Sequence, residues 1–393
     1  MPLSIGVFTY STRPRGSVVC AAALAEALVE LGHHAVLYAL DKDRGGFYRE
    51  LGCELRMMPA GPAPDHPEAL IRQRVAEVKD YVRRRSPRHD VLHAQDCLVA
   101  SGLLHAGPPV PLVRTVHHLD DFASQFLRAC QARSIHRADA CVSVSWSTQQ
   151  SVRDAFGLTT PVIENGVAPA RFADQAPDLT QKFRARHAIP DTAPLLLSVG
   201  GVEPRKNSLN MLRAFADFAS VHPDARWLVV GGASIWDHSE YTRDFRSCLA
   251  SLPEAVQRNV HLFGVLSEAE LDAAYRAADV LLHAASLEGW GLCILEAMAS
   301  GTSVVVSRGL PFEEYLDPIC ATFVEATSVA SISRGLGRAY HRRNTVAGPA
   351  VARARCFSWA RTAARHIEIY ERVLGIGAPL ARAPLRARDQ VLN

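Results

Sequence analysis

The chain has 393 residues, a formal net charge of +3 at pH 7, and 48% hydrophobic and 21% charged residues. This length exceeds what one ordinary core accommodates, so we expect two domains. The composition is that of a globular protein, and the small net charge argues against a nucleic-acid partner. Nine cysteines occur without any C-x-x-C pair. That pattern favours neither a zinc site nor a disulfide framework and fits a reducing compartment.

The N-terminal segment and the basic clusters bear on localisation. Residues 3–10 form a short apolar stretch without the basic leader or cleavage site of a signal peptide, and no run of about 20 apolar residues could span a bilayer. We therefore expect a cytoplasmic protein. Residues 83–85 and Arg88 form an arginine cluster that is typical of a solvated helix end. Peripheral contact with anionic lipid at the inner face of a membrane, or with an anionic acceptor, is the alternative. The oligomeric state stays open.

In the first half, apolar runs alternate with amphipathic segments, which predicts a doubly wound α/β domain with a parallel sheet covered on both faces. A loop at residues 11–17 follows the first strand. Predicted strands are residues 5–10, 35–40, 91–94, 111–117, 140–144 and 162–163, and predicted helices are residues 18–31, 68–85, 122–137 and 148–156.

The pattern restarts after residues 168–192, a stretch rich in Pro, Asp and Ala that holds one short helix at 179–187. We place the domains at 1–168 and 169–365, with a C-terminal helix (about 366–393) completing the first and a ligand cleft between them. Residues from 375 onward read as a loosely held tail. Predicted strands are residues 195–199, 225–230, 260–263, 278–283 and 303–307, and predicted helices are residues 208–221, 268–277 (capped by Ser267), 295–300 and 358–374.

Residues 286–296 carry the strongest chemical signal. Glu288 and Glu296 flank a glycine turn between a predicted strand and a predicted helix. Ligands of open α/β sheets bind beyond the carboxyl ends of strands, where a helix N-terminus offers free N–H groups. Gly289 and Gly291 allow a ligand to approach the backbone closely. Carboxylates that accept hydrogen bonds from hydroxyl groups suit a sugar or a ribose.

A second signal is the cation pair Arg205 and Lys206, in the loop that follows the strand at 195–199. Two cations between a strand and a helix are well placed to bind a diphosphate. A solvated loop pair is the alternative. Cys293 has no basic neighbour in the sequence, which argues against a nucleophilic thiol.

Taken together, these motifs resemble the retaining family-4 glycosyltransferases (glycosyl transferases group 1), and the resemblance covers nearly the whole chain. Residues 288–301 resemble the signature E-G-F-G-L-P-x-x-E-A-M-A-x-G, with Cys293 in place of the proline. Residues 199–207 resemble the family's phosphate-binding loop, with Gly201 where an arginine is frequent. The family's N-G-V, T-x-H and final crossing helix are matched by residues 164–167, 115–117 and 357–370.

The resemblance implies a GT-B fold, two Rossmann-like domains facing across a cleft, and a retaining hexosyltransferase that uses a UDP- or GDP-linked sugar. Glu288 would bind the donor sugar, Glu296 the ribose, and Arg205 and Lys206 would neutralise the leaving diphosphate. His117 would contact the sugar; if the strand register differs by one residue, His118 would make this contact instead. Further donor contacts are implied for Gly16, Ser17, Val265, Gly289, Trp290, Gly291, Leu292 and Cys293. Independently of the resemblance, Asp120 and Asp121 are candidate acceptor contacts, because they lie in the loop after a predicted strand.

The implied reaction is front-face departure and attack, in which the leaving phosphate takes the acceptor's proton and the protein supplies positioning and charge. No D-x-D signature occurs, so we predict metal independence and no cofactor besides the donor. The acceptor, a small molecule, a glycan or a lipid-linked compound, is set by the loops at 11–17, 41–47 and 118–124. A sugar-nucleotide epimerase or phosphorylase and a non-catalytic nucleotide-binding partner are the alternatives. An NAD dehydrogenase is disfavoured because the G-x-G-x-x-G fingerprint is missing.

Overall fold

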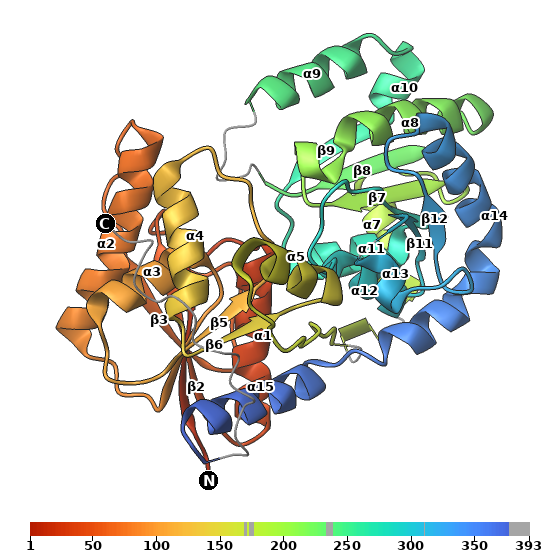
Figure 1. Ribbon diagram of the computed structural model, residues 1–393. Helices are drawn as coiled ribbons and strands as arrows, with labels where there is room; N and C mark the ends of the chain where they lie inside the picture. The colour runs from red at the N-terminus through yellow and green to blue at the C-terminus, as the bar shows by residue number, and fades with distance from the viewer. Residues whose placement is uncertain (169–170, 173–176, 233–238, 310, 377–393) are drawn as a thin grey trace. The chain divides into compact units, whose positions relative to one another are not determined.

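The computed structural model describes residues 1–393 except 169–170, 173–176, 233–238, 310 and 377–393 (Figure 1). It divides into two compact units, one of residues 1–164 with the segment from Trp359 onward, the other of residues 165–358. The sequence places the corresponding boundaries at 168/169 and 365/366. Residues 377–393, which include most of the predicted tail, lie outside the described part. No helix that is described is long and apolar enough to cross a membrane.

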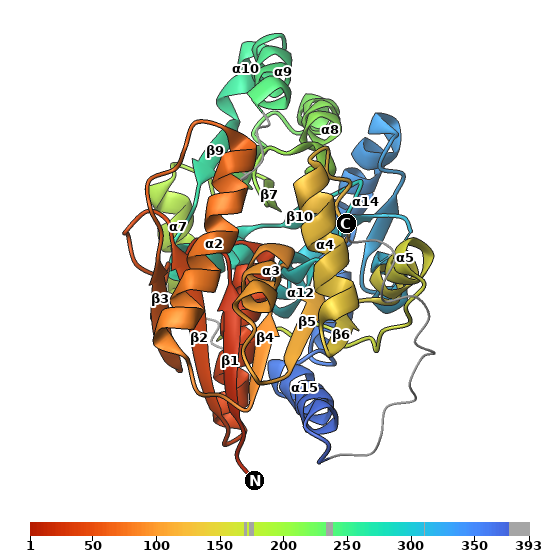
Figure 2. The same cartoon turned by 60° about the vertical axis from the view of Figure 1, so that its left-hand side comes forward.

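The first unit is built on a six-stranded parallel sheet in the order β3-β2-β1-β4-β5-β6. Helices α1 and α15 pack on one face of the sheet. Helices α2 and α3, with α4 beside them, cover the other face (Figure 2). The elements are β1 (Ser4–Thr9), α1 (Gly16–Glu30), β2 (His34–Asp41), β3 (Glu54–Pro59), α2 (Pro67–Arg85), β4 (Val91–Ala94), α3 (Cys97–Ala106), β5 (Leu112–Val116), α4 (Gln125–Arg137), β6 (Ala140–Ser143), α5 (Trp146–Phe156) and α15 (Trp359–Val373).

Side-chain caps define the starts of three helices in this unit. Asp96 accepts hydrogen bonds from the N–H groups of Leu98 and Val99 at the start of α3, and Ser124 and Ser145 cap α4 and α5. The predicted loop at 11–17 was two residues too long, because α1 already begins at Gly16.

The second unit holds another six-stranded parallel sheet, in the order β12-β11-β10-β7-β8-β9. Helices α8, α9 and α14 contribute buried side chains to the core on one face. The elements are α7 (Pro177–Arg186), β7 (Leu195–Val199), the 3-10 turn η1 (Pro204–Lys206), α8 (Ser208–Val221), β8 (Arg226–Val230), α9 (Ser239–Ala250), α10 (Glu254–Arg258), β9 (Val260–Gly264), α11 (Glu268–Ala277), β10 (Val280–His283), α12 (Leu292–Ala299), β11 (Ser303–Ser307), α13 (Phe312–Tyr315), β12 (Thr322–Val324) and α14 (Val329–Ala354).

Both sheets are doubly wound, as predicted. Their strand order reverses between β1 and β4 in the first unit and between β7 and β10 in the second. Ligands of open α/β sheets bind at such switch points, outside the carboxyl ends of the strands. A ligand site of the second unit is therefore expected at the loops that follow β7 and β10.

Candidate functional site

The turn between β10 and α12 has the predicted order of strand, glycine turn and helix. Gly291 has φ +91°, and a Cβ there would lie 2.8 Å from Cδ1 of Ile294. Only glycine fits this conformation and this space. The helix begins directly afterwards at Leu292, so the N–H groups of Leu292 and Cys293 lie in its first turn.

The loops after β7 and β8 approach each other at a pair of glycines. Gly231 has φ +137°, and a Cβ on it would lie 2.4 Å from the backbone N of Gly201. Gly201 donates its N–H to the carbonyl of Val230 at 3.0 Å. The backbone of the predicted phosphate-binding loop is therefore fixed by contacts that leave no room for a side chain.

We expect Gly231→Ala to lower the free energy of unfolding by more than about 1 kcal/mol, because alanine is strained at this φ and would displace the loop. Gly337→Ala is the matched control, since a Cβ at this position in α14 meets no atom within 4 Å. Alanine in a helix is favoured over glycine by up to about 1 kcal/mol, so the control should be stabilised. Urea unfolding of both variants measures the difference, and an equally stable Gly231→Ala would contradict the close approach.

Backbone contacts join the loops after β7 and β10. The carbonyl of Arg205 accepts hydrogen bonds from the N–H groups of Ser286 (2.9 Å) and Leu287 (3.3 Å) and from Oγ of Ser286 (3.1 Å). The side-chain amide of Asn207 donates to the carbonyls of Ala284 (3.0 Å) and Ala326 (2.7 Å). These contacts hold Lys206 over the turn that carries Glu288. Sequence reasoning missed Asn207 and Ser286, because a contact to a backbone carbonyl requires no particular partner residue.

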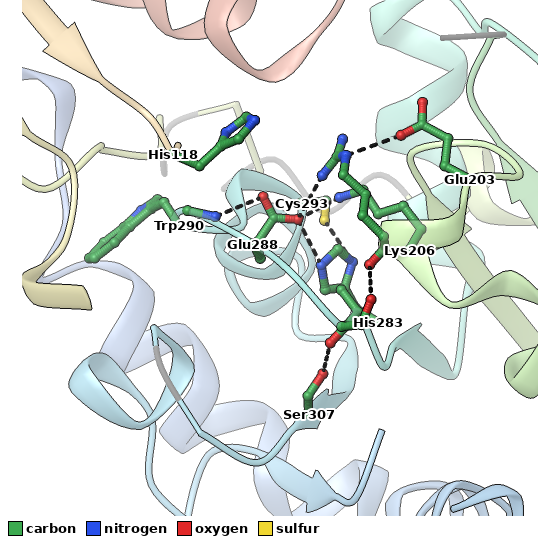
Figure 3. Close-up of polar contacts among 12 residues, drawn as sticks. His118, Glu203, Lys206, His283, Glu288, Trp290, Cys293 and Ser307 are labelled. Atoms are coloured by element: carbon green, nitrogen blue, oxygen red, sulfur yellow. Dashed lines mark hydrogen bonds and ion pairs between the residues drawn. The ribbon is translucent and has the colours of Figure 1, made fainter. Parts of the chain in front are cut away.

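Glu288 lies at the centre of a buried charge cluster (Figure 3). Its Oε2 atom lies 2.5 Å from Nζ of Lys206, 3.2 Å from Nε2 of His283 and 3.7 Å from Nη1 of Arg205. Burial alone would raise the pKa of Glu288, but the charge of Lys206, the His283 hydrogen bond and the charge of Arg205 together lower this pKa well below its ordinary value. The carboxylate is therefore ionised at neutral pH, and the predicted sugar and diphosphate residues form one connected cluster.

The two cations differ in exposure. The Arg205 side chain is 36% exposed and pairs through Nε with Glu203 at 3.1 Å, whereas the Lys206 side chain is 10% exposed. Arg205 is therefore the more accessible cation for an incoming anion, and Lys206 is the one fixed against Glu288.

Glu296 has different surroundings from Glu288. It lies on the second turn of α12, where Tyr275 of α11 donates its hydroxyl hydrogen to Oε2 at 2.7 Å. Burial raises the pKa of Glu296, against the opposing effects of the Arg171 charge and the Tyr275 hydrogen bond. The nearby Arg171 guanidinium is itself held by Asp272, with 2.8 Å between Nε and Oδ2. The two glutamates of the motif therefore lie in separate polar environments.

Cys293 has no basic residue adjacent in the sequence, but the fold brings one close. The Sγ atom of Cys293 lies 3.4 Å from Nδ1 of His283, a residue ten positions earlier. The conclusion about reactivity is unchanged, because burial raises the pKa of the Cys293 thiol to about 12.

Trp290 and Val265, two further predicted donor contacts, are placed very differently. The Trp290 ring stacks on Tyr315 with 4.4 Å between ring centroids, and Oη of Tyr315 donates to the Trp290 carbonyl at 2.6 Å. Only 3% of the Trp290 surface is exposed, so this indole packs in the interior beside the glycine turn. Val265 is 52% exposed, directly after β9, and is free to meet a ligand.

The predicted residues of the first unit follow the carboxyl ends of β1 and β5, the two strands that flank β4 in the sheet. Gly16 and Ser17 are the first two residues of α1, which follows β1. His117 follows β5 and donates through Nε2 to Oε1 of Gln95 at 2.9 Å. His118 instead pairs with Asp120, with 3.2 Å between Nε2 and Oδ1, whereas Asp121 is exposed.

Among the described residues, no group of three or more His, Cys, Asp or Glu side chains could hold a metal ion. The Glu288 cluster is thus a cationic and carboxylate site at a strand-to-helix turn, suited to binding hydroxyl groups and phosphate.

Comparison with known proteins identifies the class. The family Glycosyl transferases group 1 matches residues 180–348, and Glycosyltransferase Family 4 matches residues 14–171. The D-inositol 3-phosphate glycosyltransferase of Streptosporangium roseum is 30% identical over 311 residues, which are 72% of this chain and 69% of that protein. The chain therefore belongs to the group 1, family-4 glycosyltransferases.

Solved structures confirm the predicted fold class. Sucrose-phosphate synthase (tll1590) from Thermosynechococcus elongatus superimposes with a TM-score of 0.75 at 19% identity, covering 95% of this chain and 99% of that one. Anabaena Alr3699/HepE in complex with UDP-glucose superimposes with a TM-score of 0.73 at 18% identity, covering 93% and 99%. The protein is a glycosyltransferase with the GT-B fold.

Proposed function

We propose that this glycosyltransferase moves a hexose from a UDP- or GDP-linked donor to an acceptor hydroxyl with retention of anomeric configuration. The observation that carries the proposal is the ionised Glu288, held by Lys206 directly before the N-terminus of α12. Carboxylate, cations and helix N–H groups together suit a sugar joined to a diphosphate. The similar Anabaena protein was solved with UDP-glucose bound, which supports this donor class.

In the proposed reaction, the bond between the anomeric carbon and the diphosphate oxygen breaks. The acceptor oxygen bonds to that carbon on the same face, and its proton passes to the leaving phosphate. Glu288 holds sugar hydroxyl groups, and Arg205 and Lys206 offset the charge that develops on the diphosphate. Since these cations perform the task of a divalent ion, we propose that transfer needs no metal. His117, Gly16 and Ser17 of the first unit are proposed to act on the same donor.

A panel of sugar nucleotides tests the proposal. A UDP- or GDP-sugar at about 100 times its dissociation constant should stabilise the protein by about 2.7 kcal/mol in a thermal-shift experiment. Incubation with EDTA should leave transfer unchanged, and NMR of the product should show the donor's anomeric configuration. An epimer formed from donor alone would favour the epimerase, and absence of binding to every donor would favour a non-catalytic partner.

Glu296→Gln should raise the donor KM by about tenfold, because an amide is a weaker acceptor for ribose hydroxyl groups than a carboxylate and the difference matches one charged hydrogen bond. Steady-state kinetics with the donor identified by the sugar-nucleotide panel measure this KM. Glu254→Gln in α10 is the matched control, since Glu254 pairs with Arg258 on the surface. An unchanged KM in Glu296→Gln would remove this residue from the donor site.

For the acceptor, we propose a polyol that carries a negative charge, bound by the first unit. Burial and the nearby Arg15 charge lower the pKa of Lys42 to about 8, and its Nζ lies 4.8 Å from the centre of the Tyr10 ring. An anion beside this ammonium would stabilise its charged form. The Streptosporangium roseum relative is named for D-inositol 3-phosphate, so D-inositol 3-phosphate is the first acceptor to test.

A further inference from the structure

His283 is a buried residue of the site for which neither the sequence nor the proposed function supplies a role. It ends β10 with 3% of its surface exposed, and its ring meets the edge of Phe312 at 5.8 Å between centroids. Both ring nitrogens have polar partners. Nε2 lies 3.2 Å from Oε2 of Glu288, and Nδ1 lies 3.4 Å from Sγ of Cys293 (Figure 3).

These two contacts select one tautomer of the imidazole. Burial and the Lys206 charge lower the pKa of His283, so the ring carries one proton at neutral pH. The Cys293 thiol keeps its proton, because burial raises its pKa. A neutral ring accepts at one nitrogen and donates at the other. The thiol donates to Nδ1, and the ring proton therefore lies on Nε2, where it is donated to Glu288.

The two carboxylate oxygens of Glu288 therefore accept different numbers of hydrogen bonds. Oε2 receives the Lys206 ammonium and the His283 N–H, with Arg205 near it. Within the described part of the chain, Oε1 receives only the N–H of Gly289, at 3.3 Å. A carboxylate offers about four lone-pair sites, so Oε1 keeps free acceptor capacity.

We propose that His283 is a positioning residue for Glu288: Cys293 holds the imidazole as the Nε2–H tautomer, and the imidazole and Lys206 together fix Oε2 so that Oε1 accepts from a hydroxyl group of the donor sugar. This inference rests on the proposed role of Glu288 in sugar binding. It also assigns a role to Cys293, which occupies the proline position of the family signature. A proline there has no side-chain proton to donate to His283.

A purely structural histidine would behave differently from a positioning one. Removing it would lower stability and would affect nucleotide binding and turnover only through unfolding. A positioning residue affects the step that uses the sugar and leaves the affinity for the sugar-free nucleotide unchanged. Glutamine can place an N–H close to the position of Nε2, whereas leucine cannot, so this pair of substitutions isolates the hydrogen bond.

The kinetic test compares His283→Leu, His283→Gln and wild type. UDP-glucose and GDP-mannose are the donors for turnover, and UDP and GDP are the probes for calorimetric binding. We expect His283→Leu to lower kcat about 10- to 100-fold, the range of a hydrogen bond to a charged group, with nucleoside diphosphate affinity unchanged. His283→Gln should recover activity to within about threefold. His222→Leu, at the C-terminal end of α8 and the opposite end of the sheet, is the matched control and should retain full activity.

The tautomer is read separately, without any ligand, by long-range ¹⁵N–¹H correlation on protein labelled with ¹⁵N-histidine, and His283→Gln identifies the signal. We expect an Nε2–H imidazole in wild type and in Cys293→Ser, and a mixture of tautomers in Cys293→Ala. An Nδ1–H ring in wild type, or full turnover by folded His283→Leu, would overturn the inference while leaving the proposed function intact. A wild-type protein that turns over neither donor and binds neither diphosphate would instead reject the proposed function.

Discussion

Replacing Lys206 with methionine is expected to lower kcat/KM for sugar transfer by about 10²- to 10³-fold, the range found when one preorganised charge-stabilising donor is removed from an active site. Methionine keeps an unbranched apolar side chain and removes the ammonium. Lys206 lies 2.5 Å from Glu288 with only 10% of its side chain exposed, so little water can replace the lost charge. Steady-state kinetics measure the loss, and circular dichroism checks that the variant is folded.

A double-mutant cycle with Glu288→Gln distinguishes two ways in which Lys206 can act. If Lys206 acts through Glu288, the double variant loses no more activity than the worse single variant. If it binds the diphosphate directly, the two losses multiply. Removing one partner of a buried pair is destabilising, so Lys206→Met should be less stable than the double variant, in which neither partner is charged. A folded Lys206→Met with full activity would contradict the proposed site.

Much of the fold could be predicted because its signals are local. The helix at 268–277 has the predicted bounds, and Ser267 caps it as predicted, in a capping box with Glu270. The strands at 91–94 and 303–307 and the helix at 208–221 also have the predicted bounds. In each case an apolar run or a helical period is bounded by a residue that ends it.

The sequence patterns did not predict β3 and α14, whose local sequences disfavour the structure that they adopt. β3 is a sheet edge with only Met58 buried, so it lacks the apolar run of a central strand. α14 contains Pro349 and several glycines, which predict an interruption, yet its Ile332, Leu336 and Ala339 are fully buried in the core. Tertiary packing here overrides local propensity.

In the candidate site, too, the sequence predicts some features and the structure alone reveals others. The motif spacing identified Glu288, Arg205 and Lys206, and the structure brings these three together. The contact of His283 at the end of β10 with Cys293 at the start of α12 depends on the path of the turn between them, and sequence spacing does not reveal it.

The first unit contains a buried histidine network that makes it sensitive to acid. The ring of His93 lies between Oη of Tyr370 and Oγ1 of Thr115, each 2.7 Å from a ring nitrogen. His366, on the same helix as Tyr370, lies 5.2 Å from His93 between ring centroids. Burial lowers the pKa of His366 to about 4 and that of His93 well below its ordinary value. Both rings are therefore neutral in the folded protein at pH 7.

The direction of the pH effect follows from these pKa values. In the unfolded chain each histidine gains a proton below about pH 6.5, whereas in the folded protein His366 gains one only near pH 4. Acid therefore favours the unfolded state between these limits. We expect the free energy of unfolding of the first unit to fall by about 3 kcal/mol from pH 6.5 to 4 through His366 alone. His93 acts in the same direction.

Hydrogen exchange of amides in α15 and β4, at several pH values between 7 and 4, measures this loss after correction for intrinsic exchange. His366→Leu should flatten the dependence, because it removes one titrating group. It should also fold well, because Nε2 of His366 has no hydrogen-bond partner among the described residues and only Nδ1 donates, to the Thr362 carbonyl. His341→Leu, at an exposed position of the second unit, should keep the wild-type slope. Equal slopes in wild type and His366→Leu would show that this ring is already protonated when folded.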